Sequence, residues 1–400
     1  MRVSTADFYA RSLISMRDRQ SALAEVQRQL GNGLRLENPV DDPAGAASVS
    51  RLGAALAAAD AYSAMVNRAN TAMAAEEGAL TSVNDVLNRV RELTLQAQSA
   101  AQSQESRRAI ATEVQALRAQ LLSLANSRGA DGEYLFAGYS VSVPPFQETA
   151  GVVSYVGDAG QRTLELSPGN NIAVADPGSS VFAGARAGNG VFVSAAAPTN
   201  SGTLMIGGTA VVGSFVPDDY TVSFAVAADG TASYTVTGVL SGAVASGVYA
   251  DGDTLDFNGV TLNLSGAPAN GDSLSVTPAG RQDVFSALSE LNNALYLSDA
   301  TPAQRAAQVN RLSRSLETLD QQLTHLSSVR ADIGSRLKVA EVVADAHAGS
   351  ALQIQQALST VRDLDYAEAA TRLAQNITGL QAAQEAFSRL ANLSLFNSLR

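Results

Sequence analysis

Two adjacent carboxylates, those of Asp41 and Asp42, are the first side chains in the sequence whose type and spacing could do chemistry. Paired carboxylates can bind a divalent cation or act as general acid and general base. No histidine stands near them, and Pro43 follows at once. Aspartate is a good helix N-cap, and proline is favoured in the first helical turn. The pair is therefore predicted to start a helix, with a catalytic or metal site as the alternative.

The other residue types that catalyse reactions or bind metals are scarce. The chain has no cysteine, which excludes disulfides, thiolate metal sites and cysteine nucleophiles. Its two histidines, His325 and His347, fall in a segment of helical pattern at polar or alanine-rich positions. We expect both to be solvated helix residues, so the sequence predicts no metal site and no cofactor.

A group of aspartates in the central part of the chain is the remaining material for an enzyme. Most of them fall where β-hairpin turns are expected, and neither Gly-x-Ser-x-Gly nor His-Glu-x-x-His occurs. The group comprises Asp218, Asp219, Asp229, Asp251, Asp253 and Asp256. We expect a protein that is not an enzyme. A glycan-active enzyme in this segment is the alternative, and mutation of a carboxylate pair with a screen for hydrolysis would test it.

Charge and hydropathy restrict the possible partners. A net charge of −11 argues against nucleic acid, because phosphate binding needs clustered positive charge. No apolar run approaches the ~20 residues that span a membrane. The N-terminal segment lacks the apolar core and cleavage site of a classical secretory signal. We therefore expect no nucleic acid and no membrane contact, and either a cytosolic protein or one exported without a cleaved signal.

The composition divides the chain into three zones. Of the 32 glycines, 22 lie between residues 138 and 280, as do 8 of the 11 prolines. β-Branched and aromatic residues alternate in this zone, and Asp229-Gly230 and Asn258-Gly259 are hairpin signals. The central zone is thus predicted to be β-rich, in two small subdomains at about 138–182 and 190–278.

The two flanks are predicted to be helical. In each, apolar residues recur at alternating spacings of three and four, which is the period of a coiled-coil seam. One stripe is Ile110, Val114, Leu117, Leu121 and Leu124; the other, after a Thr301-Pro302 start signal, is Val309, Leu312, Leu316, Leu319, Leu323 and Leu326. Residues 80–97 are expected to add a third helix.

These zones predict an α+β fold: a long helical coiled-coil stalk built from the N- and C-terminal segments, with an inserted β-rich outer region. Because the β zone interrupts the helical sequence, the two flanks must pack on each other. The expected divisions are an inner terminal coiled-coil segment (1–42 with 363–400), a helical stalk domain (43–137 with 284–362), a β-hairpin subdomain (138–182) and an outer β domain (183–283).

The extreme ends of the chain carry thinner apolar stripes, interrupted by glutamine and alanine. A lone helix pair with so narrow a seam is marginal, because helices gain most of their stability from packing. We predict ends that become ordered when copies of the chain pack together, and the alternative is a bundle closed within one chain. The expected assembly seam comprises Leu13, Met16, Leu23, Leu30, Leu373, Ile377, Leu380, Phe387 and Leu390.

An elbow is predicted where the first helix gives way to the second. Gly31 and Gly33 can end a helix, since glycine accepts the left-handed conformation, and Asn38-Pro39 makes a turn. The next helix is then re-aimed. The elbow is expected to depend on Asp41, Asp42 and Gly45.

The same stretch resembles the N-terminal signature of the bacterial flagellin family. Residues 30–49, LGNGLRLENPVDDPAGAASV, carry Gly-Leu-Arg and Asp-Asp-x-Ala-Gly elements, and residues 88–103, NRVRELTLQAQSAAQS, are similar to the next block. Near the C-terminus, Asp363, Asp365, Tyr366 and Ala367 resemble the acidic motif of the family. Residues 129–146, GADGEYLFAGYSVSVPPF, are similar to members that lie at the hook-filament junction.

The resemblance implies a structural subunit of the bacterial flagellum that joins hook to filament, adapts one lattice to the other and seeds filament growth. The alternative is flagellin, the filament subunit. The implied partners are further copies of the chain, hook-associated protein 1, flagellin and a flagellar export chaperone. The implied location is extracellular, after export by the flagellar type III apparatus without a cleaved signal peptide.

The resemblance also implies roles for two residue groups. Arg89, Arg91 and Glu92 match a stalk contact patch used between family subunits, and a solvated charged helix face is the alternative. A short hairpin is expected to pack against the stalk. Its aromatic and apolar anchors are Tyr134, Leu135, Phe136 and Phe146.

Overall fold

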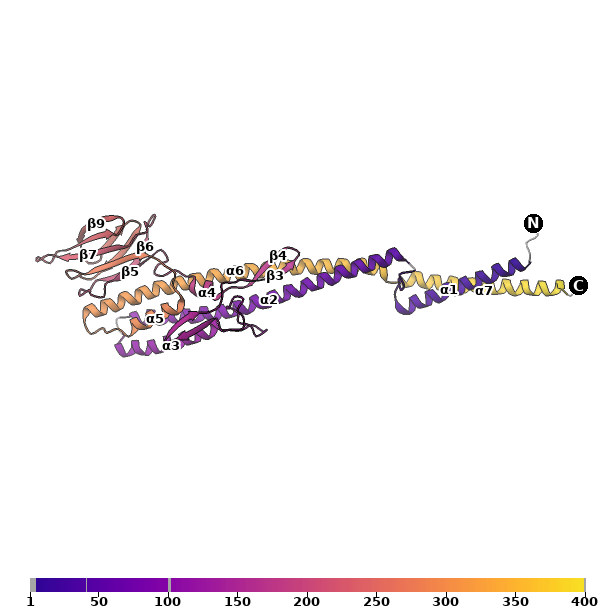
Figure 1. Cartoon of the computed structure of the whole chain (residues 1–400), viewed down its shortest axis with the longest axis horizontal. Helices are drawn as coiled ribbons and strands as arrows, with labels where there is room; N and C mark the ends of the chain where they lie inside the picture. Colours follow the sequence, from indigo (N-terminus) through magenta and orange to yellow (C-terminus); the bar gives the residue numbers. More distant parts are fainter. Residues whose placement is uncertain (1–4, 41, 100–101, 399–400) are drawn as a thin grey trace. The chain divides into compact units, whose positions relative to one another are not determined.

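The computed structural model describes residues 5–40, 42–99 and 102–398. Long helices precede and follow a β-rich middle part, which confirms the predicted α+β class (Figure 1). The helices are α1 (Thr5–Asn32), α2 (Pro43–Gln98), α3 (Gln104–Ala125), α5 (Val284–Leu295), α6 (Pro302–Arg362) and α7 (Tyr366–Ser398). The chain divides into two compact units, Met1–Ala64 with Val342–Arg400, and Met65–Glu341.

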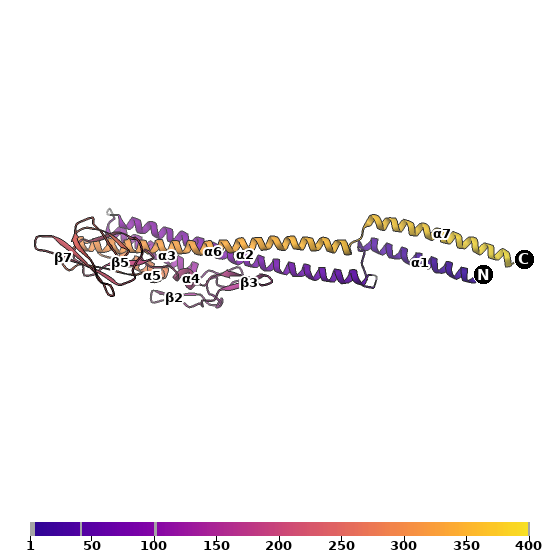
Figure 2. The same cartoon turned by 90° about the horizontal axis from the view of Figure 1, so that it is seen from above.

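In the first unit, α1 and α7 lie side by side, and the start of α1 and the end of α7 lie at the same end of this helix pair (Figure 2). Helix α1 stops at Gly33, whose φ of +70° is left-handed. The start of α7 is capped by Asp365, whose carboxylate accepts the N–H groups of Ala367 and Glu368 at 2.9 and 3.1 Å.

In the second unit, buried stripes follow the predicted seven-residue period along the long helices. On α6 every seventh residue is at most 3% exposed: Leu312, Leu319, Leu326, Ile333 and Ala340. On α2 the buried positions alternate three and four apart: Val66, Ala69, Met73, Glu76, Leu80, Val83, Leu87 and Val90. Such stripes are the seams by which long helices pack together.

The helix predicted at residues 80–97 is present as the last part of α2, which begins at Pro43. Two glycines inside the helix, Gly53 and Gly78, do not break it. Each stands in open space and costs only about 1 kcal/mol relative to alanine. At Gly78 the buried stripe on either side offsets that cost.

Helix α6 begins at the predicted Thr301-Pro302 signal with a reciprocal cap. The Thr301 hydroxyl accepts the Gln304 N–H, and the Gln304 side-chain carbonyl accepts the Thr301 N–H, both at 3.2 Å. This is the capping-box arrangement, which satisfies two backbone donors at once. Local sequence therefore fixes where this long helix starts.

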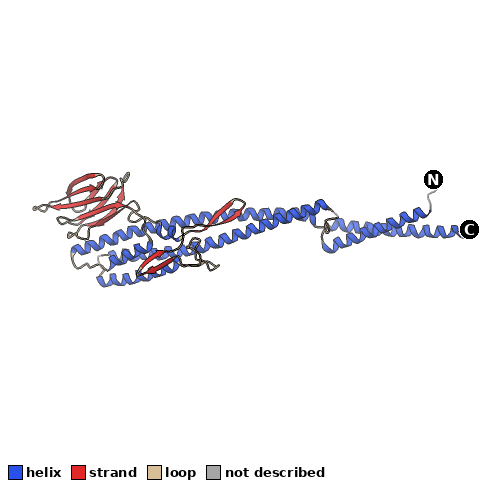
Figure 3. Cartoon of the chain, in the orientation of Figure 1, coloured by secondary structure: helices blue, strands red, loops and turns tan. Residues whose placement is uncertain are grey.

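The first part of the β-rich zone consists of two separate hairpins and a short helix (Figure 3). They are β1 (Phe146–Thr149) with β2 (Val152–Tyr155), β3 (Arg162–Ser167) with β4 (Asn170–Ala175), and α4 (Gly178–Ala183). Phe146 packs against Phe182 of α4 and Phe285 of α5, with ring centroids 5.2 and 5.4 Å apart. This aromatic cluster attaches the first hairpin and α4 to α5.

The second part is a two-layered β domain, here called the outer domain. Its strands are β5 (Phe192–Ala196), β6 (Met205–Val211), β7 (Tyr220–Val226), β8 (Ala232–Gly238), β9 (Gly242–Tyr249), β10 (Thr254–Phe257), β11 (Val260–Ser265) and β12 (Ser273–Pro278). They form two sheets, ordered β5-β12-β7-β8-β9 and β10-β11-β6. Buried side chains from both sheets form one core. Both predicted hairpins are present, with left-handed Gly230 and Asn258-Gly259.

Candidate functional site: assembly surfaces

The predicted elbow contains a close side-chain contact in the first unit. The Asp42 carboxylate accepts the N–H of Gly45 at 2.9 Å, and the Asp42 carbonyl accepts the N–H of Ala46 at 2.9 Å. A Cβ at Gly45 would overlap the Asp42 carboxylate and the Leu36 side chain. The structure therefore brings Asp42 and Gly45 together, while Asp41 lies outside the described residues.

The two connections between helices are also bonded to each other, which the sequence did not reveal. The Arg35 N–H donates to the Arg362 carbonyl at 2.7 Å, and the Leu364 N–H donates to the Gly33 carbonyl at 3.0 Å. The Arg35 guanidinium donates to the Val361 carbonyl at 2.6 Å. Arg35 and Val361 stand 326 residues apart, and the other two pairs are similarly distant in the sequence, so no local pattern indicates these bonds.

The predicted assembly seam is incompletely covered by the helix pair α1–α7. Leu13 and Ile377 are exposed, at 47% and 39%. The side chain of Leu390 lies outside the described residues. The other six predicted seam residues are half-buried: Met16, Leu23, Leu30, Leu373, Leu380 and Phe387. By contrast, Val26 of α1 is only 6% exposed. Within the described residues the pair thus leaves this apolar seam partly uncovered, and the seam is here called the apolar strip.

The predicted stalk contact patch is tied to neighbouring helices in the second unit. Arg89 forms ion pairs with Glu92 at 3.1 Å and with Glu113 of α3 at 2.8 Å. Arg91 forms one with Asp320 of α6 at 2.5 Å, and this hydrogen bond raises the pKa of the Arg91 guanidinium. Both arginines therefore hold helices of the same chain together.

A buried ionic cluster lies where α2, α6 and the segment after β4 meet. The Asp176 N–H donates to one Glu76 carboxyl oxygen at 3.0 Å, and the other oxygen of Glu76 is buried without a hydrogen-bond partner. Arg336 pairs with the Asp176 carboxylate. Burial, and then the negative charge of Asp176, raise the pKa of Glu76 to about 8.

Sequence reasoning missed this cluster, although one signal was present. Glu76 occupies a core position of the α2 heptad stripe, between the buried Met73 and Leu80. A carboxylic acid at such a position indicates either a buried partner or a neutral form. Its partner Asp176 stands 100 residues away, so the sequence does not name it.

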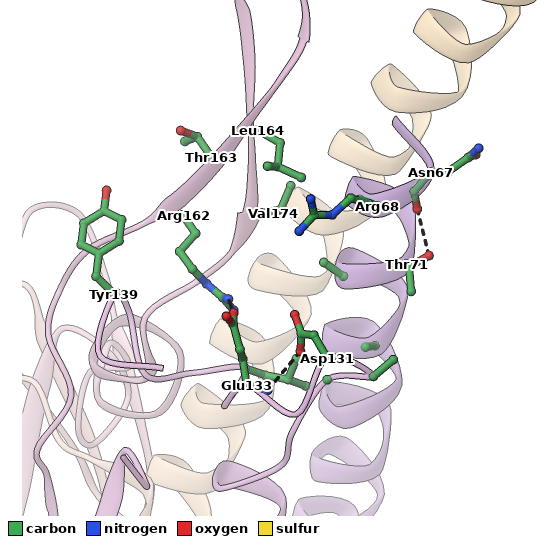
Figure 4. A pocket seen from close by; sticks show the side chains of 15 residues that line it. Asn67, Arg68, Thr71, Asp131, Glu133, Tyr139, Arg162, Thr163, Leu164 and Val174 are labelled. Carbon is green, nitrogen blue, oxygen red and sulfur yellow. Dashed lines mark hydrogen bonds and ion pairs between the residues drawn. The ribbon is translucent and has the colours of Figure 1, made fainter. Parts of the chain in front are cut away.

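An open groove of about 600 Å³ lies between α2, the loop at residues 129–133 and the β3–β4 hairpin (Figure 4). Arg68 and Thr71 come from α2, and Leu164 comes from β3. Arg162 pairs with Glu133 across it at 2.6 Å. The labelled side chains hold no histidine, and the acids are committed to local bonds, so the groove offers shape rather than reactive groups.

The two histidines lie on α6, as predicted, and both are half-buried with a specific neighbour. The His325 Nε2 lies 2.8 Å from the Ser180 carbonyl oxygen, which requires a proton on Nε2. The His347 ring stacks on Tyr62, with centroids 5.6 Å apart and planes 6° from parallel. In the described parts of the chain, no three side chains among His, Asp and Glu come together as a metal-binding group.

The aspartates considered for catalysis serve the turns of the outer domain. The Asp218 carboxylate accepts the N–H groups of Leu240 and Ser241, and that of Asp229 accepts the Thr231 N–H. Hydrogen bonds lower the pKa of Asp229, so it stays charged at neutral pH. No described helix is both long and apolar enough to cross a membrane.

Comparison with known proteins matches both ends of the chain and most of its length. The bacterial flagellin N-terminal helical region matches residues 3–141, and the C-terminal helical region matches residues 316–399. Flagellar hook-associated protein 3 of Escherichia coli (strain K12) is 24% identical over 396 residues, which is 99% of each chain.

Two crystal structures are similar to this one. FlgL of Xanthomonas campestris is 33% identical, over 77% of this chain and 99% of that chain, with a TM-score of 0.72. The flagellar junction protein FlgL of Legionella pneumophila is 31% identical, over 79% of this chain and 100% of that one, with a TM-score of 0.73.

Proposed function

This chain belongs to the hook-associated protein 3 (FlgL) family of flagellar structural proteins, and we propose that it forms a layer of identical copies between hook and filament. The observation that carries the proposal is the apolar strip along α1 and α7. Its residues are predicted from sequence to face a neighbour, and the helix pair leaves them exposed or half-buried.

In this proposal the terminal helices complete their packing only in the assembly. Burial of apolar surface contributes about 25 cal/mol per Å² removed from water. That contribution offsets the conformational entropy lost when the two ends of the chain become ordered. Assembly, rather than a chemical reaction, is then the activity, and no catalytic residue is proposed.

The layer would adapt the hook lattice to flagellin and seed filament growth. Its partners would be hook-associated protein 1 on one side, flagellin on the other and an export chaperone before assembly. The chain would leave the cell through the flagellar type III apparatus without a cleaved signal peptide. The full-length similarity to a hook-associated protein supports this proposal over a flagellin of the filament.

The test is a deletion of the gene for this chain, with electron microscopy of the cells and a flagellin assay of the culture medium. The proposal predicts bare hooks and flagellin lost to the medium, with both defects reversed by the wild-type chain. A variant with Leu13→Ser and Ile377→Ser should fail to reverse them. Normal filaments in the deletion strain would contradict the proposal.

A further inference from the structure

The outer domain carries charges of one sign only. Between Arg186 and Arg281 the sequence has no lysine, arginine, histidine or glutamate. Its charged side chains are Asp218, Asp219, Asp229, Asp251, Asp253, Asp256 and Asp272. Because like charges repel, a contact between the acidic surfaces of two outer domains is unfavourable. Positive charge from another part of the chain would favour a contact that uses these carboxylates.

Four of these carboxylates gather at one corner of the domain, here called the acidic corner. Asp229 is in the β7–β8 turn, Asp251 and Asp253 are in the β9–β10 turn, and Asp256 is on β10. The two turns are neighbours, because Ala232 pairs with Tyr249. Local hydrogen bonds hold the carboxylates, for example that of Asp251 from the Gly266 N–H at 2.6 Å. Asp253 is half-buried and the other three are exposed.

An open groove of about 770 Å³, here called the arginine groove, lies between the end of β5, the α5–α6 connection and α6. Arg311 and Arg314 line it from neighbouring positions on α6. Among the described residues neither guanidinium has a hydrogen-bond or ion-pair partner, and Glu290, which also lines the groove, pairs with neither. The rest of the lining includes alanines and Leu297.

Seven other arginines of this unit have a carboxylate partner: Arg89, Arg91, Arg107, Arg118, Arg162, Arg330 and Arg336. A guanidinium binds carboxylates with a planar fork of donors, so two free ones in a groove suit an acidic surface.

The acidic corner and the arginine groove lie at opposite edges of the sheets, because β5 lines the groove and β9, next to the corner, is the other edge strand of the five-stranded sheet. Strand β6 contacts α6, because the Ile206 N–H donates to the Asn310 side chain at 2.8 Å and Thr209 donates to Glu317 at 2.7 Å. Strand β10 is the opposite edge of the same sheet. The corner of one chain therefore cannot fill its own groove, but it can fill that of a neighbour.

We propose that the arginine groove binds the acidic corner of a second copy of this chain, so that neighbouring outer domains join head to tail. A head-to-tail contact uses two different surfaces and can repeat around a ring. Single exposed ion pairs contribute little, but complementary charge fixes which surfaces meet and in what orientation. This inference rests on the proposed function, since it concerns contacts within the layer.

Disulfide crosslinking tests the contact in assembled flagella, because the chain has no cysteine of its own. A variant carrying Arg311→Cys and Asp253→Cys should give a ladder of linked chains after oxidation, and a reducing agent should remove it. The matched control pairs Asp253→Cys with Arg108→Cys, an exposed residue of α3, and should give no ladder. Filaments that grow with the variant chain incorporated but unlinked would overturn the contact and leave the proposed function standing.

Charge reversal gives a second readout that does not depend on cysteine. Arg311→Glu with Arg314→Glu should increase the loss of filaments under shear severalfold, and added Asp251→Arg and Asp253→Arg should restore wild-type retention. Wild-type retention in the first variant, or no restoration in the second, would overturn the contact. Failure of the wild-type chain to support any filament would instead contradict the proposed function.

Discussion

The buried carboxyl group of Glu76 shows what a single residue can add to a helical seam. Its side chain is 1% exposed and replaces an apolar residue in the α2 stripe, yet it receives the Asp176 N–H and so attaches the segment after β4 to α2. Burial raises the pKa of Glu76 to about 8. The charge of Asp176 adds to this increase, and the charges of Arg336 and Arg162 oppose it. At neutral pH the group is therefore mostly neutral.

We predict that Glu76→Gln reduces the dependence of stability on pH. In the native state Glu76 keeps its proton up to about pH 8, whereas the unfolded chain loses it near 4.5. Between about pH 4.5 and pH 8 the native state thus binds more protons than the unfolded chain. The stability that Glu76 contributes is therefore fully present below about pH 4.5 and is lost as pH rises to about 8. Between pH 5 and pH 8 the free energy of unfolding of the wild-type chain should fall by about 2–4 kcal/mol more than that of the variant. Urea unfolding at the two pH values measures both.

The matched control for this prediction is Glu113→Gln, which removes a carboxylate from the exposed ion pair with Arg89. Its pH dependence should follow that of the wild-type chain. Parallel curves for the wild-type chain and Glu76→Gln would show that Glu76 titrates alike in both states.

At the scale of elements, the sequence predicted what local chemistry decides. The capping box at Thr301 and the turn glycines Gly230 and Gly259 act on backbone groups a few residues away. The helix start and the hairpin turns could therefore be predicted from the sequence. The full length of α2 was not predicted, since the predicted helix at residues 80–97 is only its last part. The proposed elbow between α1 and α2 combines both cases, because the cap of Asp42 is local and the bonds of Arg35 to Arg362 are not.

We predict that Asp42→Ala loosens the first turn of α2. The Gly45 N–H loses its acceptor, and loss of an N-cap costs about 1 kcal/mol. Hydrogen exchange of the Gly45 amide should accelerate, while that of Ala46, which donates to a backbone carbonyl, should change less. Asp42→Ser keeps an acceptor and should restore most of the protection. Equal exchange in all three chains would exclude a capping role.

We predict that exposed and buried positions of the α1–α7 pair respond differently to mutation. Leu13→Ser and Ile377→Ser should leave the thermal melting of the isolated chain within about 1 °C and prevent its incorporation into flagella, since both side chains are exposed in the single chain. Val26→Ser, at a buried position, should lower the helix content of the isolated chain itself. Circular dichroism with an incorporation assay separates the two cases. Normal incorporation of the variant with Leu13→Ser and Ile377→Ser would show that these residues are not needed for assembly.

At the scale of the whole molecule, the order of the zones in the sequence predicted that a β domain is inserted into a helical one. The contacts that join the two ends of the inserted domain could not be predicted. The Ala279 N–H donates to the Val191 carbonyl, and the Ala187 N–H donates to the Gly280 carbonyl, both at 2.9 Å. The outer domain therefore begins and ends at one place, with its own core between its sheets. Neither the pairing of β12 between β5 and β7 nor the arginine groove has a signal in the sequence, because each depends on residues far apart.

We predict that the outer domain can be removed without unfolding the helices. Replacing residues 187–280 by Gly-Gly joins Arg186 to Arg281, which already form a bridge between antiparallel segments. The shortened chain should keep its helical circular dichroism and a cooperative melting transition. Loss of both would show that the β domain is needed to fold the helical part.

The most direct test of the account is to locate the chain in intact flagella. A short epitope inserted after Leu240, which is 84% exposed in the β8–β9 turn of the outer domain, gives a site for gold-labelled antibody away from the acidic corner. If the chain forms a junction layer, electron microscopy should show gold only in a narrow band between hook and filament, in cells whose filaments are of normal length. Gold along the whole filament would contradict the account and identify the chain as a filament subunit.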